Sequence, residues 1–224
     1  FLLGSAYMGL GSAYRLLGDF SHMQEAFRKS IHHNRLAGNF LPEMLAVSAV
    51  TLSAILYGQL SLALEEGLQA IRRMETSQAS FPPISATVYG AVGLVYYERN
   101  LLSLLRDLFV QSHRLSSLSG HNAGVVYSKI LTSRCELAEG HLDQAEHILR
   151  DALDLLALGA PVWMRPDVAA QQVRILLSRD GPAAAEATVV HFGLKYESGV
   201  CIPGRLEMQT DELYLSALRL ALHR

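Results

Sequence analysis

The side chains most capable of chemistry in this sequence do not form a known catalytic arrangement. His32 and His33 are adjacent, and because consecutive residues on a helix point about 100° apart, the two imidazoles do not readily share a metal ion. Glu65 and Glu66 are also adjacent and have no acid/base partner nearby in the sequence, which is typical of an exposed helix face. Ser, His and Asp all occur, but a G-x-S-x-G motif does not. We therefore expect no enzyme and no catalytic residues.

Motifs that bind phosphate groups or metal ions are missing as well. The pair Gly9-x-Gly11 does not follow a strand, so it indicates helix packing rather than a dinucleotide-binding loop. A G-x-x-x-x-G-K-[ST] stretch, which would cradle ATP phosphates, does not occur. The two cysteines, Cys135 and Cys201, belong to no CxxC motif or Cys/His cluster, which suits a reducing cytoplasm. We expect no cofactor, no metal site and no disulfide framework.

The composition indicates a folded chain with a sizeable core. Of the 224 residues 50% are hydrophobic and 18% are charged, and the formal net charge is -2. Because nucleic-acid binding requires clustered Lys and Arg, the chain is not expected to grip nucleic acid itself. Residues 44–64 carry no charge, but Gly58 and Gln59 make a turn there and serines interrupt the apolar surface. We expect a buried helix in this stretch and no membrane span.

The strongest pattern in the sequence is a turn that recurs every 40 to 42 residues. In the copy that fits best, a helical run ends at Glu139, Gly140 makes the turn, the apolar Leu142 follows, and the small Ala145 opens the next helix. The turn residue needs a positive φ, which Gly adopts freely and Asn tolerates. The apolar residue packs between the two helices, and the small residue lets them approach closely. The turn residues are Gly18, Gly58, Asn100, Gly140 and Gly181, and the small positions are Met23, Ala63, Leu105, Ala145 and Glu186.

A fixed period in this range is the signature of stacked helix pairs, so the predicted fold class is all-α, a right-handed α-solenoid with a period near 40 residues. Strand-like alternation is not seen. We expect one domain over residues 1–224, with repeats at about 1–40, 41–82, 83–121, 122–162 and 163–194, and 206–222 as the first helix of a further repeat. Because the chain starts at Phe1 without a methionine, we also expect a fragment of a longer protein. The predicted helices cover residues 2–17, 21–37, 42–57, 60–76, 84–99, 101–118, 122–139, 142–158, 166–179, 182–192 and 206–222.

The residues around the turns resemble the tetratricopeptide repeat (TPR) signature L-G-x-x-Y…A-x-x-x-F. Leu10-Gly11-x-x-Tyr14 is followed by Gly18-Asp19-Phe20 and later by Phe27, and Gly93-x-x-Tyr96 with Phe109 repeats part of this pattern. The period is longer than the usual TPR period of about 34 residues, so both helices of each pair are lengthened. HEAT-type repeats share the longer period but lack this glycine turn and its small residue.

Lengthened repeats of this kind, with the segment Tyr96-Tyr97-Glu98-Arg99-Asn100, are similar to the MalT-type sensor array of the large ATP-dependent LuxR-family transcription regulators of bacteria. The helix at 212–220 is similar to the end of that array. The resemblance implies that this chain senses an inducer, either a small molecule or a protein, and signals to an NTPase module and a DNA-binding domain. ATP and DNA would then be partners only of domains absent from this sequence. Self-association of the chain is a further possibility.

The first helices of stacked pairs line the concave face of a curved array, where partners usually bind. Polar and aromatic residues on these mostly apolar helices are therefore the candidates for a binding groove. Each has an alternative role, either in packing between repeats or in pairing with a nearby carboxylate. The alternative to the sensor function is a general scaffold that binds a protein or peptide. The candidate groove residues are Arg15, Tyr97, Glu98, Tyr127, Arg134, Gln171 and Arg174.

Overall fold

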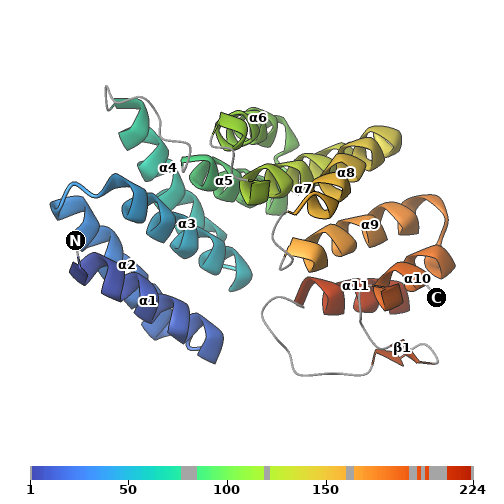
Figure 1. The fold of residues 1–224 in the computed structure, drawn as a ribbon, viewed down its shortest axis with the longest axis horizontal. Coiled ribbons are helices and arrows are strands. Elements are labelled where there is room, and N and C mark those ends of the chain that lie inside the picture. The colour runs from blue at the N-terminus through green and yellow to red at the C-terminus, as the bar shows by residue number, and fades with distance from the viewer. Residues whose placement is uncertain are drawn as a thin grey trace. The chain divides into compact units, whose positions relative to one another are not determined.

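A computed structural model describes residues 2–76, 85–118, 122–159, 164–191, 196–197, 200–201 and 211–222 of the chain. Among these residues there are eleven helices and two short strands. The chain divides into two compact units, Phe1–Gly124 and Val125–Arg224. In each unit, successive helices lie beside one another in chain order (Figure 1). The predicted all-α architecture of packed helix pairs is confirmed.

The first unit contains three helix pairs that share a core. Its helices are α1 (Leu2–Leu17), α2 (Phe20–Leu36), α3 (Phe40–Leu56), α4 (Leu60–Thr76), α5 (Ala86–Glu98) and α6 (Leu102–Leu118). Each helix packs against the next one. In addition, α3 and α5, which are the first helices of the second and third pairs, pack against each other. Phe27, Met44, Met74 and Val92 come from four different helices and are buried in one continuous core. The stacking of pairs, rather than any single pair, therefore buries the apolar faces.

The second unit holds the remaining helices and both strands. Its helices are α7 (Asn122–Ala138), which begins just before the unit boundary, α8 (Leu142–Ala157), α9 (Arg165–Arg179), α10 (Pro182–His191) and α11 (Asp211–Leu222). The helix α9 packs against α8, α10 and α11. Val173, Val189 and Leu220 are fully buried where α9, α10 and α11 meet. Helix α9 thus has the central place in this unit that α3 has in the first.

The recurring turns are confirmed by the backbone conformation. All five predicted turn residues have positive φ angles, and Asn100 is the only non-glycine residue that does so in the described part of the chain. The conformation also occurs between successive pairs, at Gly38 with φ 67° and Gly159 with φ 102°. The φ angles are 72° for Gly18, 72° for Gly58, 56° for Asn100, 86° for Gly140 and 82° for Gly181.

One backbone hydrogen bond recurs in these turns. The N–H group that follows the turn residue donates to the carbonyl oxygen five residues earlier, as in the Schellman arrangement of helix ends. This bond satisfies a carbonyl group that the helix end would otherwise leave unpaired, and it brings the chain back to start the next helix. The donor and acceptor residues are Asp19 and Tyr14 (3.0 Å), Gln59 and Ala54 (2.7 Å), Leu101 and Tyr96 (2.9 Å), and His141 and Glu136 (2.8 Å).

The fifth turn is one residue shorter than the sequence predicts. There Gly181 itself donates its N–H to the carbonyl oxygen of Leu176 at 3.0 Å, which in the other turns is the role of the residue after the glycine. Helix α10 therefore starts one residue earlier relative to its turn, and the small residue at the close approach is the fully buried Ala185. The assignment of this position to the half-buried Glu186 was wrong. The other assigned positions, Met23, Ala63, Leu105 and Ala145, are buried as predicted.

The predicted bounds of the first ten helices agree with the structure to within two residues. The predicted start of the last helix, residue 206, lies outside the described residues. One pair of short strands accompanies the helices: β1 (Tyr196–Glu197) pairs antiparallel with β2 (Val200–Cys201). Strands of two residues are too short to show alternation in a sequence. That residues 1–224 form one domain stays a prediction.

None of the described helices is long and apolar enough to cross a membrane. The uncharged stretch 44–64 is divided by the Gly58 turn between the end of α3 and the start of α4. Helix α3 packs against α2, α4 and α5, so it is buried on several sides, and this explains why it is apolar nearly all round.

Candidate functional site

A cleft of about 580 Å³ lies along α2 in the first unit. One face of α2 forms most of its wall, and Gln59, from the turn between α3 and α4, completes it. Since α2 is the second helix of its pair, this cleft differs from the groove that sequence analysis placed on the first helices. The lining residues are Phe20, Ser21, Gln24, Glu25, Arg28, Lys29, His32 and Gln59.

The charged side chains of the cleft are paired near its surface. Lys29 Nζ donates to Glu25 Oε1 at 2.6 Å, and Arg28 Nε lies 3.5 Å from Glu66 Oε1 of α4. The hydrogen bond from Lys29 lowers the pKa of Glu25, and the same bond raises the pKa of Lys29. Arg28, Lys29 and Glu25 are each about half exposed. Exposed ion pairs of this kind contribute little to stability. An anionic group of a ligand could therefore replace Glu25 at Lys29 and Glu66 at Arg28 with little loss of free energy.

At one end of the cleft, the lining residue Phe20 belongs to an aromatic stack, and the lining residues Gln24 and Gln59 form an amide pair. The ring of Phe20 stacks on that of Tyr57, with centroids 3.7 Å apart. Gln24 Nε2 donates to Gln59 Oε1 at 3.4 Å, which joins α2 to the turn before α4. The end near Phe20 therefore combines an aromatic ring with amide groups, whereas the end near His32 carries the charged side chains.

The adjacent residues His32 and His33 have different surroundings. His32 is exposed and borders the cleft, while His33 is half-buried and stacks on Tyr7 of α1 with ring centroids 5.5 Å apart. The two imidazole rings are nearly perpendicular, with centroids 5.2 Å apart. The other adjacent pair is also divided: Glu65 is exposed as predicted, whereas Glu66 is partly buried against Arg28, so the prediction of a wholly exposed pair was wrong.

Three of the predicted groove residues lie in the first unit. Arg15 is exposed in the last turn of α1. Tyr97 and Glu98 are the last two residues of α5, where Tyr97 is half-buried and Glu98 is exposed. Both helices are first helices of their pairs, as predicted, and α3 packs against each of them. A groove that uses these three residues stays a prediction.

The other four predicted groove residues lie in the second unit, on α7 and α9. Tyr127 and Arg174 are half-buried, and Arg134 is buried. Gln171 is fully buried, and its Nε2 donates to Ser133 Oγ at 3.0 Å. Ser133 Oγ in turn donates to the carbonyl oxygen of Ala145 at 2.8 Å. Gln171 therefore joins α9 to α7 and, through Ser133, to α8; its role in ligand binding stays a prediction.

A buried carboxylate that sequence analysis did not identify joins three helices of the first unit. The side chain of Glu43, on α3, is only 3% exposed. It accepts a hydrogen bond from Arg35 Nε of α2 at 3.0 Å and one from Arg73 Nη1 of α4. A buried carboxylate between two guanidinium groups is a structural feature that fixes the helices to one another. Its sequence signal was weak, because Glu43 stands alone in an apolar helix.

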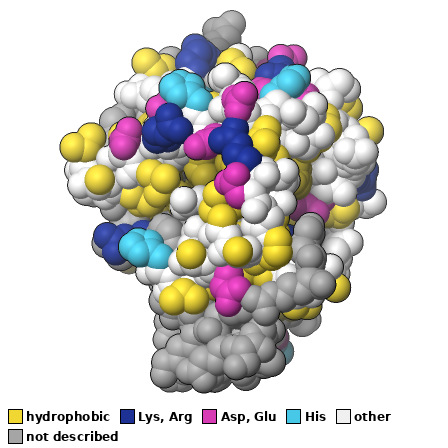
Figure 2. All heavy atoms as spheres, turned by 90° about the vertical axis from the view of Figure 1, so that its right-hand side faces the viewer, with side chains coloured by type: hydrophobic (Ala, Val, Ile, Leu, Met, Phe, Trp, Pro, Cys, Tyr) yellow, Lys and Arg dark blue, Asp and Glu magenta, His cyan; other side chains and the backbone are white. Residues whose placement is uncertain are grey.

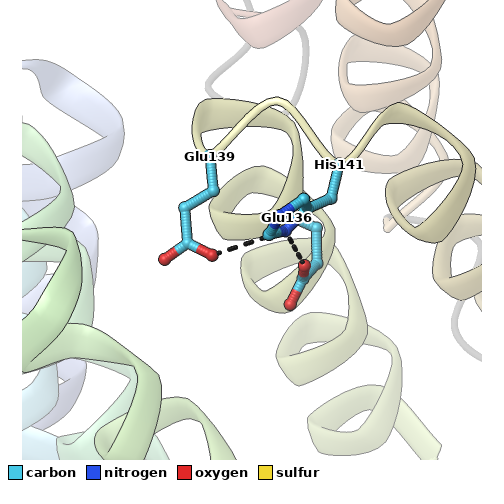
Figure 3. A group of neighbouring side chains, drawn as sticks. All are labelled: Glu136, Glu139 and His141. Atoms are coloured by element: carbon cyan, nitrogen blue, oxygen red, sulfur yellow. Dashed lines mark hydrogen bonds and ion pairs between the residues drawn. The ribbon is translucent and has the colours of Figure 1, made fainter.

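A second group that sequence analysis missed lies at the Gly140 turn of the second unit (Figure 3). His141 Nδ1 is 2.9 Å from Glu136 Oε2 and 3.6 Å from Glu139 Oε2. These three donor atoms lie within 4.8 Å of one another, so the group has the geometry to hold a metal ion. The sequence signal was the spacing E-x-x-E-x-H across a turn. A search restricted to Cys/His motifs does not find it, because only the turn brings the histidine back over the helix end.

Charges of both signs are interleaved on the face of the molecule shown in Figure 2, with apolar atoms scattered between them. Ion pairs of this kind join α8 and α9, where Arg179 pairs with both Asp143 and Glu146, and Glu146 also accepts from Arg150 Nη2 at 3.1 Å. A face of mixed charge lacks the continuous basic surface that nucleic-acid binding requires.

No protein-family model matches the chain, and no curated protein sequence matches it. Its structure is similar to that of a thermophilic TPR protein from Thermus thermophilus, with a TM-score of 0.63 over 98% of this chain and 99% of that chain, at 15% sequence identity. A tetratricopeptide repeat protein from Parabacteroides merdae aligns over 99% of this chain and 87% of that chain, at 10% identity and a TM-score of 0.40, which is too low to carry an argument. At these identities the first similarity concerns the fold alone: the chain has the stacked helix pairs of a TPR-like array.

Proposed function

We propose that this chain is a protein-interaction scaffold that binds an acidic peptide segment of a partner in the cleft along α2. The observation that carries the proposal is the cleft itself, in which Arg28 and Lys29 lie along the same face of α2 as the aromatic ring of Phe20. A groove on stacked helix pairs is a recurring way to hold a peptide, with apolar anchors giving affinity and charged groups giving specificity.

The chemistry of the cleft favours acidic side chains in the partner. Arg28, Lys29 and His32 face a single lining carboxylate, Glu25. Carboxylates of a bound peptide would replace Glu66 at Arg28 and Glu25 at Lys29, and guanidinium groups bind carboxylates in a two-pronged manner. An apolar or aromatic side chain of the same peptide would pack on Phe20. The expected ligand is thus a short segment with one apolar anchor followed by acidic residues.

The proposal is tested by selection from a displayed peptide library on the immobilised chain, followed by fluorescence anisotropy with the enriched peptides. We expect the enriched sequences to combine acidic residues with an apolar anchor. The double variant Arg28→Ala, Lys29→Ala should weaken their binding by about tenfold, since it removes two exposed charge pairs worth up to about 1 kcal/mol each. Enrichment without acidic residues, or equal binding to the double variant, would contradict the proposal.

A matched control comes from the second unit. Arg150 and Glu146 form a pair four residues apart on one helix, like Lys29 and Glu25, but they are not among the residues that line the cleft. The variant Arg150→Ala should therefore bind the selected peptides as the wild type does. Equal losses in both variants would indicate attraction to the overall charge of the chain rather than recognition in the cleft.

A finer hypothesis comes from the sequence resemblance to the MalT-type sensor array, in which the array receives an inducer for a transcription regulator. The motif Leu10-Gly11-x-x-Tyr14 and the residues on the first helices favour it. A thermal-shift screen of sugars, amino acids and metabolites tests this function, because a ligand that binds only the folded chain raises the unfolding midpoint. Midpoints that rise with the selected peptides and with none of the small molecules would favour the scaffold over the small-molecule sensor.

A further inference from the structure

We propose that Glu136, Glu139 and His141 form a zinc site at the turn between α7 and α8 (Figure 3). The ligands would be one carboxylate oxygen of each glutamate and Nδ1 of the imidazole. This site is independent of the cleft on α2, because it lies in the other unit of the chain.

The distances between the donor atoms fit a tetrahedral ion. Zinc binds imidazole nitrogen and carboxylate oxygen at about 2.0–2.2 Å, which places two neighbouring donor atoms about 3.3 Å apart. The observed separations from His141 Nδ1 are 2.9 Å to Glu136 and 3.6 Å to Glu139. The two carboxylate oxygens lie within 4.8 Å of one another, so side-chain rotations that bring them closer together would complete the arrangement.

The backbone of the turn already holds these residues in place. Glu136 lies in the last turn of α7 and Glu139 directly follows its last residue. The N–H of Glu139 still donates to the carbonyl oxygen of Cys135 at 3.0 Å, so the two glutamates, three residues apart, lie on the same side of the helix end. Gly140, with φ 86°, reverses the chain, and the N–H of His141 donates to the carbonyl oxygen of Glu136 at 2.8 Å. The imidazole is thus carried back beside the first of the two carboxylates. A site fixed by a closed turn pays little ordering entropy when the ion binds.

The position of Glu136 is unusual within the repeat pattern. Four residues before the turn, the first three pairs have Tyr14, Ala54 and Tyr96, none of which is charged. Glu136 replaces them with a carboxylate whose side chain is only 8% exposed. The Gly140 turn thus differs from the first three in placing a carboxylate oxygen 2.9 Å from the residue that follows the turn glycine.

Both carboxylates converge on the same nitrogen atom of His141. A protonated Nδ1 carries one hydrogen, and at 2.9 Å that hydrogen serves Glu136. Glu139 Oε2, at 3.6 Å, is beyond hydrogen-bond distance, yet it faces the same nitrogen. A metal ion between the three atoms would bind both carboxylates and the imidazole nitrogen at once. The convergence of two carboxylates on one nitrogen is therefore the geometry of a cation site.

The donor set selects the kind of cation. Magnesium and calcium prefer oxygen ligands alone, whereas an imidazole nitrogen with carboxylates suits zinc. The buried Cys135 contacts the other oxygen of Glu139, with Sγ 3.7 Å from Oε1, and so holds that carboxylate in position. His141 is 58% exposed, which opens the site to ions from solvent. Three protein ligands leave one coordination position for water.

The experiment is a calorimetric titration of the metal-stripped full chain with zinc chloride, repeated with magnesium chloride. Binding of one zinc ion per chain, much tighter than magnesium, is the expected result. His141→Asn and Glu139→Gln should each lower the zinc affinity at least about tenfold, since even the loss of a group that supports a ligand costs 10- to 100-fold. Cobalt in place of zinc provides a second readout, because its visible absorption reports tetrahedral coordination and should be lost in both variants.

A control separates this site from adventitious binding to surface histidines. His147, on α8 in the same unit, is exposed and is not part of the group. His147→Asn should bind zinc as the wild type does, and circular dichroism should show that all three variants keep their helices. Zinc affinity that is unchanged in His141→Asn, or reduced equally in His147→Asn, would overturn the proposal. Equal affinities for magnesium and zinc would also overturn the proposal.

Discussion

Gly11 of α1 lies directly against the aromatic ring of Phe27 of α2. A Cβ atom at position 11 would be 2.5 Å from both Cδ1 and Cε1 of Phe27, where no atom fits. The same relationship holds between Gly93 of α5 and Phe109 of α6, whose ring would overlap an added Cβ. In each pair the missing side chain on the first helix makes the space that the phenylalanine of the second helix fills.

The same two repeat positions are filled differently in the second and fourth pairs. Gly11 and Gly93 come seven residues before their turn, and the two phenylalanines come nine residues after it. In the second pair the sizes are reversed, with Thr51 at the first position and Gly67 at the second, and Val92 of α5 packs against Gly67. In the fourth pair the same two positions are Ser133 and Leu149. A glycine on the first helix that accommodates a phenylalanine of the second is thus a feature of the first and third pairs.

The first prediction compares two glycines of α1. Gly11→Ala should lower the free energy of unfolding by about 1–3 kcal/mol, because the added methyl group overpacks the contact with Phe27. Gly9 has no atom within 4 Å of an added Cβ, so Gly9→Ala should raise stability by up to about 1 kcal/mol through better helix propensity. Urea denaturation of the two variants measures the difference. Equal effects at both positions would show that Gly11 is not a packing contact.

The sequence predicted the fold well because the turns dominate it. A positive φ restricts a position to Gly or Asn, so the five turn residues are visible in the sequence as a period, and helix ends follow from them within two residues. The fifth small position was assigned wrongly because that turn is one residue shorter than the others. Its glycine is still visible in the sequence, but the following helix starts one residue earlier, so Ala185 takes the place assigned to Glu186.

The candidate sites were less predictable, because they depend on contacts between side chains. The cleft lies on α2, a second helix. The predicted groove was placed on the first helices, because these line the concave face of a curved array. Glu136 and His141 belong to different sides of a turn, and their 2.9 Å contact follows from the path of the backbone. Gln171, by contrast, was noticed as a polar residue in an apolar helix, and its burial against Ser133 provides a packing reason for it.

The second prediction concerns the backbone at Gly140, where φ is 86° and no atom lies within 4 Å of an added Cβ. The cost of a side chain there is conformational strain alone. Gly140→Val should destabilise the chain by about 1–3 kcal/mol, because a β-branched residue at positive φ is strained. Gly140→Asn should cost much less, as Asn100 adopts φ 56° in the equivalent turn. Thermal denaturation without added metal compares them, and equal midpoints for the two variants would exclude strain as the cause.

The third prediction concerns the buried carboxylate of Glu43. Glu43→Gln keeps the size of the side chain but removes the charge that Arg35 and Arg73 share. We expect a loss of about 1–3 kcal/mol of stability, since two partly exposed guanidinium groups lose the negative charge that they pair with. Glu65→Gln, on the exposed face of α4, is the control and should leave the denaturation midpoint unchanged. A stable Glu43→Gln variant would mean that the two arginines find other acceptors or water.

The fourth prediction is the pH dependence of the cap on α2. Asp19 Oδ1 accepts the backbone N–H of His22 at 3.2 Å, and this bond, followed by the one to the His22 side chain, lowers the pKa of Asp19 below its usual 3.8. A lowered pKa stabilises the fold above the unfolded value, and this contribution is lost as the pH falls through the folded value. Asp19→Asn keeps the cap without the charge. The wild type should be the more stable of the two near about pH 6, and the difference should vanish near about pH 2. A difference that does not change with pH would contradict this account.

The last prediction tests the close approach at Ala145 and the coupling between neighbouring helices. Ala145 is fully buried, and its carbonyl oxygen accepts the hydroxyl of Ser133, so α7 and α8 touch at this point. Ala145→Leu adds three heavy atoms to this contact and should cost about 1–3 kcal/mol by overpacking. Ala157→Leu, at the exposed end of the same helix, should stay within about 0.5 kcal/mol of the wild type.

The location of the damage distinguishes a repeat array from a single cooperative core. Because each pair contacts mainly its neighbours, Ala145→Leu should speed amide hydrogen exchange first around Gly140 and along α7, α8 and α9. Exchange near Gly18, three turns earlier in the chain, should change much less. Hydrogen-exchange mass spectrometry of the variant and of Ala157→Leu measures both regions. Uniform loosening from α1 to α11 would contradict the array, and unchanged exchange at Gly140 would show that α8 can move aside to accept the leucine.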